Sequence, residues 1–210
     1  MRILVLGASG GVGRRVVERG LARGLKVRAQ TRTAARLADL AGAVEVVEAD
    51  PLDAAAVQEI LRDVDAVVYA LGIGHRGKTT FFSETTRILL AAMAASGVRR
   101  LVAVTGVGAG ETRGHGGAFY DRVVFPLFTR NLYDDKERQE ALIEASGLDW
   151  VVVRPAPFAN RPATGRLQVH TRIAPDLVLR RVGRDEVAAF VLDQLTSDAY
   201  LRRKPFIGHP

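Results

Sequence analysis

The sequence predicts an α/β fold in which one parallel sheet carries helices on both of its faces. Short runs of β-branched and other apolar residues alternate along the chain with segments of helical periodicity. Such alternation is typical of parallel strands that are joined by right-handed crossovers. The short runs are apolar at consecutive positions, as expected for strands that are buried on both faces. The expected architecture is therefore a doubly wound parallel sheet.

Short apolar runs mark the strands. The first leads directly into a glycine-rich turn, the sixth is expected to stop at Arg154 and Pro155, and a last short one lies near the C-terminus. The expected strands are Ile3–Leu6, Val27–Thr31, Val44–Glu48, Ala66–Ala70, Leu101–Thr105, Trp150–Val153 and Pro205–Gly208.

The helices between these runs are marked by the residues at their ends. Asp53 is of a type that caps a helix N-terminus. Gly97 and Gly147 stand just past the ends of two expected helices, where glycine is favoured. The expected helices are Val12–Arg23, Ala34–Leu40, Asp53 to about Arg62, Thr80–Ser96, Asn131–Ala145 and Asp185–Leu195.

Length and composition indicate one globular domain over residues 1–210. A chain of 210 residues can build one large core and is too short for two ordinary domains. The absence of cysteine excludes disulfides, thiolate chemistry and Cys-based metal sites. The histidines lack the spacing of metal ligands, so no metal is expected; they are His75, His115, His170 and His209.

The charge and the hydropathy pattern bear on location and partners. No apolar run is long enough to span a membrane, and no signal peptide precedes the first expected strand, so we expect a cytoplasmic protein without a membrane partner. The net charge of +7 raises the question of nucleic acid. The excess is nearly all arginine and is spread along the chain, so no nucleic-acid partner is expected. A basic field also suits an anionic dinucleotide.

A glycine-rich turn between the first strand and the first helix carries the main functional signal. Gly7 permits a tight turn, Gly10 allows a pyrophosphate to approach the backbone, and Gly13 allows the helix to pack closely on the strand. The N–H groups of the helix N-terminus then face the phosphates. A plain turn is the alternative, and the strand–turn–helix context favours a dinucleotide site of the Rossmann type. The residues expected to bind are Gly7, Ala8, Ser9, Gly10, Gly11, Val12 and Gly13.

The end of the second strand bears on which dinucleotide is bound. NAD-binding proteins usually place Asp or Glu there for the ribose 2′-hydroxyl. This chain has Arg32, nineteen residues after Gly13 (32 − 13 = 19), and Arg36 is a second candidate. A guanidinium suits a 2′-phosphate, although a solvated arginine is the competing interpretation. NADP is therefore the expected cofactor, with NAD as the alternative.

The G-x-x-G-x-x-G spacing resembles that of the short-chain dehydrogenase/reductase superfamily. Four further blocks resemble its atypical members, namely NADPH-dependent reductases of the flavin reductase/biliverdin reductase B type, with NmrA-like proteins nearby. The resemblance covers nearly the whole chain. The blocks are Thr79 to Arg87, Ser146 to Pro155, Pro155 to Gly165 and Val182 to Ala188.

The resemblance implies further cofactor contacts. Asp50 would meet the adenine amino group, or would simply be a carboxylate near a helix N-terminus. Thr105, with Gly106 and Val107, would flank the nicotinamide ribose. Lys136 would bind this ribose, or would be a surface residue paired with Glu140 at i,i+4. The other implied contacts are Pro51 and Leu52 at the adenine, Ala70, Leu71 and Gly72 under the adenosine ribose, and Pro155, Ala156, Pro157 and Phe158 at the carboxamide.

The chain departs from the superfamily at the catalytic positions. Typical members use Ser with Tyr-x-x-x-Lys, whereas Tyr133 and Lys136 here are only three residues apart and Gly106 stands where Ser is common. Pro157 replaces a histidine of the flavin/biliverdin reductases. The catalytic candidates are Lys136, Thr105 and Tyr133, and His75 and His115 are loop histidines that could donate a proton.

We expect an enzyme, an NADPH-dependent oxidoreductase that delivers hydride to a small conjugated acceptor such as a flavin, a quinone or a tetrapyrrole-like molecule. The alternative is a non-catalytic NAD(P) sensor of the NmrA-like kind. The long loop from Gly106 to Gly117 is followed by an aromatic segment, Ala118 to Phe128, which could wall a substrate pocket, act as a lid, form a dimer face, or pack as a helix on the core. The chain is expected to be a monomer or a homodimer.

Overall fold

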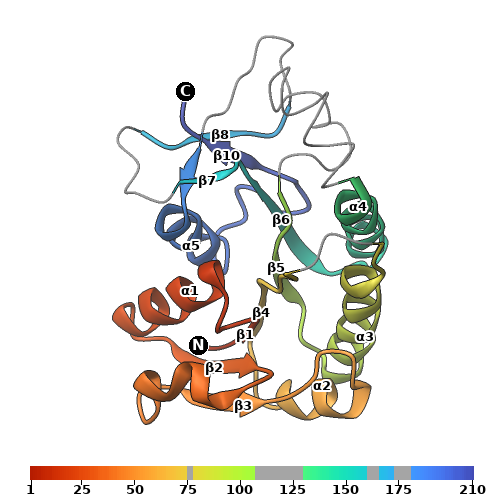
Figure 1. The fold of residues 1–210 in the computed structure, drawn as a ribbon. Helices are drawn as coiled ribbons and strands as arrows, with labels where there is room; N and C mark the ends of the chain where they lie inside the picture. The colour runs from red at the N-terminus through yellow and green to blue at the C-terminus, as the bar shows by residue number, and fades with distance from the viewer. Residues whose placement is uncertain (75–77, 107–129, 160–165, 173–180) are drawn as a thin grey trace.

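The computed structural model describes residues 1–74, 78–106, 130–159, 166–172 and 181–210. Its main element is an eight-stranded sheet with the order β3-β2-β1-β4-β5-β6-β10-β8 (Figure 1). Neighbouring strands are parallel except β10 and β8, which are antiparallel. The strands are β1 (Arg2–Leu6), β2 (Lys26–Thr31), β3 (Glu45–Glu48), β4 (Ala66–Tyr69), β5 (Arg100–Val104), β6 (Asp149–Pro155), β8 (Gln168–His170) and β10 (Phe206–Gly208).

Helices cover both faces of this sheet. Helices α1 (Gly11–Ala22) and α5 (Arg184–Asp193) lie against each other on one face. Helices α2 (Ala54–Ile60), α3 (Phe81–Ser96) and α4 (Arg130–Glu144) form the layer on the other (Figure 1). A short 3₁₀ helix, η1 (Ala34–Leu40), follows β2. Two short strands, β7 (Phe158–Ala159) and β9 (Val182–Gly183), pair with each other beside the main sheet. The expected doubly wound α/β fold of the Rossmann type is confirmed.

The two faces of the sheet bury separate hydrophobic cores. In β1, Ile3 and Val5 pack with α1 and α5, whereas Leu4 and Leu6 pack with α2 and α3. These four side chains are almost fully buried. Burying each contributes roughly 1.5–3 kcal/mol to folding. The consecutive apolar positions of the sequence therefore reflect a strand that is covered on both sides.

The strand β6 is longer than the sequence predicted. It continues through Arg154 to Pro155, because β10 pairs Phe206 with Arg154 and Ile207 with Pro155. The strands β7, β8 and β9 were not expected; they are two or three residues long, too short to produce a periodic pattern. The expected caps are present: Asp53 accepts hydrogen bonds from the N–H groups of Ala55 and Ala56, and Gly97 ends α3 in the left-handed conformation.

Within the described residues, no helix combines the length and the hydropathy needed to cross a membrane.

Candidate functional site

A cavity of about 780 Å³ opens at the carboxyl ends of β1, β2, β4 and β5. In the sheet β1 lies between β2 and β4, which is the point where the strand order reverses and where ligands bind in open α/β sheets. The volume is that of a small-molecule site. The lining residues are Gly7, Ser9, Gly10, Gly11, Val12, Gln30, Thr31, Arg32, Thr33, Arg36, Ala70, Leu71, Gly72, Ile73, Gly74, Phe81, Val104, Thr105, Lys136, Phe158 and Arg184.

The glycine turn forms the floor of this cavity. Gly7 has φ +80°, and a Cβ there would lie 2.7 Å from the carbonyl oxygen of Ala70. A Cβ on Gly13 would lie 2.2 Å from the carbonyl oxygen of Gly7. Because both distances exclude a side chain, α1 begins in direct contact with the backbone of Gly7, the residue that follows β1. The N-cap residue of α1 is Gly10, which has no side chain with which to cap the helix. The N–H groups of its first turn are therefore available to an anion.

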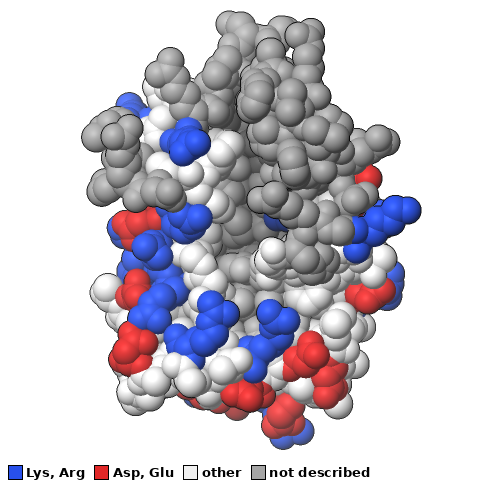
Figure 2. All heavy atoms as spheres, in the orientation of Figure 1, with Lys and Arg blue, Asp and Glu red and all other residues white. Residues whose placement is uncertain are grey.

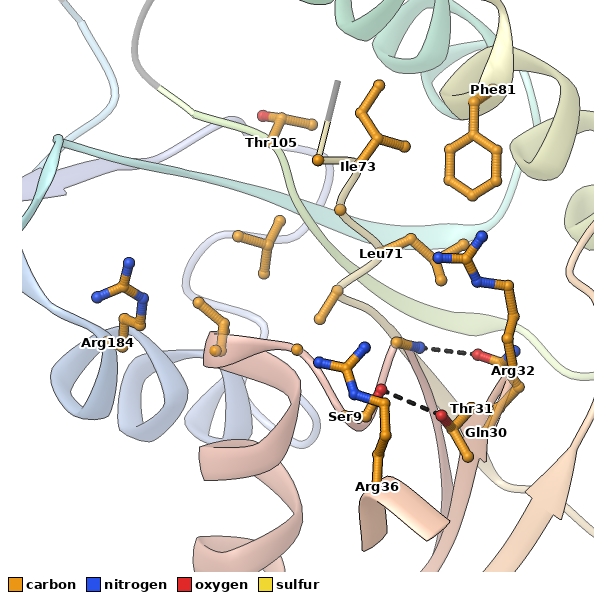
Figure 3. A pocket seen from close by; sticks show the side chains of 18 of the residues that line it. Ser9, Gln30, Thr31, Arg32, Arg36, Leu71, Ile73, Phe81, Thr105 and Arg184 are labelled. Atoms are coloured by element: carbon orange, nitrogen blue, oxygen red, sulfur yellow. Dashed lines mark hydrogen bonds between the residues drawn. The ribbon is translucent and has the colours of Figure 1, made fainter. Parts of the chain in front are cut away.

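Two polar side chains at the end of β2 fix the glycine turn. Gln30 is buried, accepts a hydrogen bond from the N–H of Gly7 at 2.9 Å and donates one to the carbonyl of Ala49 at 2.6 Å. The hydroxyl oxygens of Thr31 and Ser9 are 3.1 Å apart (Figure 3). Neither Gln30 nor Thr31 was assigned a role from the sequence. The only sign of such a role in the sequence was the presence of polar residues at the end of an otherwise apolar strand.

Arg32 and Arg36 are exposed side chains that line the cavity beyond the glycine turn (Figure 3). Arg14 on α1 holds η1, which carries Arg36, by pairing with Asp39 and donating to the carbonyl of Arg36 at 3.4 Å. The Arg14 guanidinium keeps the pKa of Asp39 below its usual range. The segment that contains Arg32 and Arg36 is thus held against α1 by the hydrogen bonds of Arg14.

The charges on the cavity wall are all of one sign. Its cations are Arg32, Arg36, Lys136 and Arg184, and no Asp or Glu is among the lining residues of the described chain. Elsewhere on this face basic and acidic side chains are interspersed (Figure 2). Just after α1, for example, Arg23 pairs with Asp193 at 2.7 Å. The cavity is therefore suited to a ligand with several negative charges.

A missing backbone donor shapes the far side of the cavity, at the end of β5. The N–H of Thr105 donates to the carbonyl of Val153 at 2.9 Å, so a regular parallel ladder would return a bond from residue 155 to the carbonyl of Thr105. Residue 155 is proline and has no N–H. The ammonium of Lys136 donates to this carbonyl instead. Pro155 thereby leaves open the position that Lys136 fills.

A buried ion pair holds the side chain of Thr105. Its hydroxyl donates to Glu140 at 2.7 Å, and Arg154 donates to the same carboxylate from Nε at 3.1 Å and from Nη2. Arg154 and Glu140 are both almost fully buried. The buried carboxylate of Glu140 thus has three hydrogen-bond donors, and removing Arg154 would leave its negative charge uncompensated. This network fixes Thr105 from its side chain while Lys136 holds its carbonyl.

Lys136 is not the surface residue that one interpretation of the sequence expected. It is buried, and the carboxylate of Glu140 is taken by Thr105 and Arg154. Burial lowers the pKa of Lys136 to about 8, and the negative charge of Glu140 opposes that shift. The ammonium also lies 5.0 Å from the ring centre of Phe82. Lys136 therefore combines access to the cavity with a pKa close to neutrality.

Most of the residues that the sequence singled out lie together at this cavity, and several do not line it. Ala8 and Gly13 are buried beneath the loop. Asp50 is exposed and its carboxylate accepts from the N–H of Leu52 at 3.0 Å, within its own turn. Those outside the lining are Ala8, Gly13, Asp50, Pro51, Leu52, Gly106, Tyr133, Pro155, Ala156 and Pro157.

Gly106 has a conformation that explains one departure from the superfamily pattern. Its φ is +153°, and a Cβ there would lie 3.4 Å from the hydroxyl oxygen of Tyr133. A serine at this position would therefore be strained and would press on Tyr133. Val107, His75 and His115, the aromatic segment from Ala118 to Phe128, and Asn160 to Gly165 lie outside the described residues.

The sequence missed Arg184 and the apolar wall of the cavity. Ile73 and Phe81 form part of that wall (Figure 3). The Arg184 guanidinium lies 4.6 Å from the ring centre of Phe158. Arg184 belongs to a block that was noted only for its resemblance to relatives. Nothing in its spacing from the glycine turn indicates that the two meet.

Comparisons with known proteins agree with this geometry. The NAD(P)H-binding family model matches residues 7–198. The uncharacterized sugar epimerase YhfK of Bacillus subtilis is 27% identical over 212 residues, which cover 93% of this chain and 88% of that protein. The structure of ChuY, an anaerobillin reductase from Escherichia coli O157:H7, has a TM-score of 0.83 with 24% identity, covering 100% and 98% of the two chains. A Rossmann-fold NAD(P)-binding family protein from Shigella flexneri has a TM-score of 0.77 with 23% identity, covering 100% and 93%.

The lowered pKa of Lys136 can be tested by NMR on protein with isotope-labelled lysine. One of the four lysine side chains of the chain is expected to titrate with a pKa of about 8, because burial disfavours its ammonium. That resonance should be absent from Lys136→Met and present in Lys204→Met. As pH rises through this pKa the cavity loses a positive charge, so affinity for an anionic ligand should fall. A wild-type protein in which no lysine titrates near this pH would contradict the prediction.

Proposed function

The chain belongs to the NAD(P)H-binding family, and on this basis we propose that it is an NADPH-dependent reductase of a small conjugated acceptor. The observation that carries the proposal is the cavity wall. A glycine turn at a helix N-terminus shares the cavity with four cations, Arg32, Arg36, Lys136 and Arg184, and the described wall has no carboxylate. NAD-specific sites usually carry an acidic residue after the second strand, where this chain has Arg32.

The proposed placement of the dinucleotide follows the charges. The pyrophosphate lies on the N-terminus of α1, against Gly10 and Gly11, as anions do at such sites. The adenosine ribose lies along Ala70, Leu71 and Gly72. The 2′-phosphate lies between Arg32 and Arg36, both of which line the cavity. Arginine suits this role because its planar fork binds phosphate oxygens in pairs.

The nicotinamide end is assigned to the side of Thr105, Lys136 and Phe158. Bound NADPH supplies the hydride. Lys136 binds a ribose hydroxyl with its ammonium while it keeps its bond to the Thr105 carbonyl, since an ammonium has three donors. Phe158 offers an aromatic face beside the carboxamide. Tyr133, next to Gly106, and Lys136 are the proposed sources of a proton for the reduced acceptor.

The class of acceptor is inferred from the apolar wall and from one relative. Ile73, Phe81 and Phe158 present apolar surface to the cavity, which suits a planar conjugated molecule. The likeness to ChuY, whose structure is described as that of an anaerobillin reductase, supports a tetrapyrrole-like acceptor. Flavins and quinones share the chemistry of accepting hydride into a conjugated system.

A non-catalytic NAD(P) sensor is the second candidate. It is favoured by the position of Tyr133 only three residues before Lys136 and by Gly106, whose positive φ disfavours a serine; the chain therefore lacks the Ser and Tyr-x-x-x-Lys arrangement. A sensor needs the dinucleotide site alone. Both candidates are therefore expected to bind NADPH, and only the reductase is expected to oxidise it with an acceptor.

Turnover tests the reductase directly. NADPH oxidation should be followed with FMN, menadione and biliverdin as acceptors, in oxygen-free buffer and with a protein-free control. We expect turnover with at least one of them, and a rate at least about tenfold lower in Lys136→Met, which loses the ribose contact. Tight NADPH binding without turnover of any acceptor would support the sensor.

The role of Arg32 can be tested by reversing its charge. In Arg32→Asp the affinity for NADPH should fall by about tenfold or more, because the 2′-phosphate loses a charge-assisted hydrogen bond and meets a carboxylate. The affinity for NADH should hold or rise. Calorimetry on wild type, Arg32→Asp and the control Arg87→Asp, an exposed site outside the cavity lining, measures both. An unchanged ratio of the two affinities would remove Arg32 from the 2′-phosphate site.

A further inference from the structure

Arg184 reaches from α5 to the N-terminus of α1. A Cβ on Gly11, the first residue of α1, would lie 2.8 Å from Nε and 2.9 Å from Cδ of Arg184. The Arg184 side chain also lines the cavity. In Figure 3 it lies on the side of the glycine turn away from Arg32 and Arg36. A second cation therefore flanks the turn, opposite the pair assigned to the 2′-phosphate.

The other arginines around this helix already have acceptors. Arg15 donates to the carbonyl of Gly11 at 3.1 Å, Arg19 pairs with Asp185, and Arg23 pairs with Asp193. Among the ion pairs between described residues, none involves Arg184. Its guanidinium rests instead on the face of Phe158, at 4.6 Å. Arg184 thus keeps its hydrogen-bonding capacity for a ligand within reach of the turn.

The backbone around Arg184 is held in place by a capping carboxylate and by a short strand pairing. The N–H of Gly183 donates to the carboxylate of Glu186 at 2.9 Å, and that carboxylate lies 3.0 Å from Nε2 of His209. The N–H of Val182 donates to the carbonyl of Pro157 at 3.0 Å. The short ladder of β7 and β9 joins the residues before Arg184 to Phe158 itself. The arginine and the ring on which it rests therefore form one unit.

We infer that Arg184 binds the pyrophosphate of the dinucleotide, and that residue 11 is glycine to make room for its side chain. The inference rests on the proposed function, whose cofactor places a pyrophosphate at this point. The N-terminus of α1 offers backbone N–H groups and a partial positive charge. Arg184 adds a full charge and a planar fork from the opposite wall. Its stacking on Phe158 reduces the rotamer freedom that is lost on binding.

This role explains a glycine that the dinucleotide motif does not require. In the G-x-x-G-x-x-G pattern Gly11 occupies a variable position. Its φ is not in the left-handed region, so backbone conformation does not demand glycine. What a Cβ would meet is the side chain of Arg184. Since this is a flexible side chain, alanine at position 11 would displace the arginine rather than distort the turn.

The test uses calorimetry with two ligands, NADPH and adenosine 2′-monophosphate, which carries the 2′-phosphate without a pyrophosphate. Arg184→Gln should weaken NADPH by about tenfold to a hundredfold and leave adenosine 2′-monophosphate unchanged. Arg184→Lys should recover part of the loss, because it keeps the charge and loses the fork. The control Arg99→Gln, an exposed arginine next to β5 at its amino end, should change neither affinity.

A double-mutant cycle tests the link to Gly11. Gly11→Ala should fold at least as stably as wild type, because alanine is the better helix former, and should still weaken NADPH. In the Arg184→Gln background the same substitution should have little further effect, because the displaced side chain is already gone. Equal losses in both backgrounds would show that the methyl group obstructs the ligand directly, and would overturn the explanation of Gly11.

The outcomes separate this inference from the proposed function. If wild type binds NADPH and Arg184→Gln binds it equally well, Arg184 does not contact the pyrophosphate and the proposed function stands. If Arg184→Gln weakens adenosine 2′-monophosphate as much as NADPH, the arginine acts elsewhere in the site and the inference is wrong. If wild type binds neither ligand, the proposed function fails and the role of Arg184 fails with it.

Discussion

The contact of α1 with the backbone of Gly7, the residue that follows β1, is the constraint on which the site depends. The carbonyl of Gly7 lies where a Cβ of Gly13 would be, and the carbonyl of Ala70 lies where a Cβ of Gly7 would be. Three segments, β1, α1 and the end of β4, are thereby brought closer than any side chain would allow. This places an uncapped helix N-terminus at the carboxyl edge of the sheet, where the ends of β2 and β5 also arrive. The cations of Arg32, Lys136 and Arg184 line the cavity that opens there.

A second feature of the site follows from a missing hydrogen bond. Pro155 cannot donate to the carbonyl of Thr105, and Lys136 supplies the donor from α4. The ion pair of Arg154 with Glu140 then holds the hydroxyl of the same threonine. A lysine that is buried to make this bond has a lowered pKa. The burial of Lys136 thus explains both its bond to the Thr105 carbonyl and the lowered pKa on which its proposed role as a proton donor depends.

Local patterns in the sequence predicted the fold and the floor of the site, and the family resemblance predicted that Thr105, Lys136 and Phe158 also line it. Contacts between distant segments that neither a local pattern nor the resemblance names could not be predicted. The alternation of apolar runs and helical periods gave the order of the longer strands and helices, since each depends on neighbouring residues. The positions of Gly7, Gly13 and Arg32 followed from a motif within one strand–turn–helix unit. Gln30 meets Gly7 across 23 residues of sequence, and Arg184 meets Gly11 across 173 (184 − 11 = 173). Only the packing of distant elements brings such residues together. The position of Asp50 also depends on the fold: it bonds within its own turn and does not line the cavity.

The proposed function requires that this cavity bind a dinucleotide with its 2′-phosphate on Arg32 and Arg36. Phosphorus NMR of NADP⁺ added to the protein tests it most directly, because the 2′-phosphate and the pyrophosphate give separate signals. The second pKa of such a phosphate monoester is about 6 in water. We expect both signals to shift on binding, and the bound 2′-phosphate to remain a dianion below that pH because two guanidinium groups favour its charged form. A 2′-phosphate that titrates as it does in free NADP⁺ would contradict this placement.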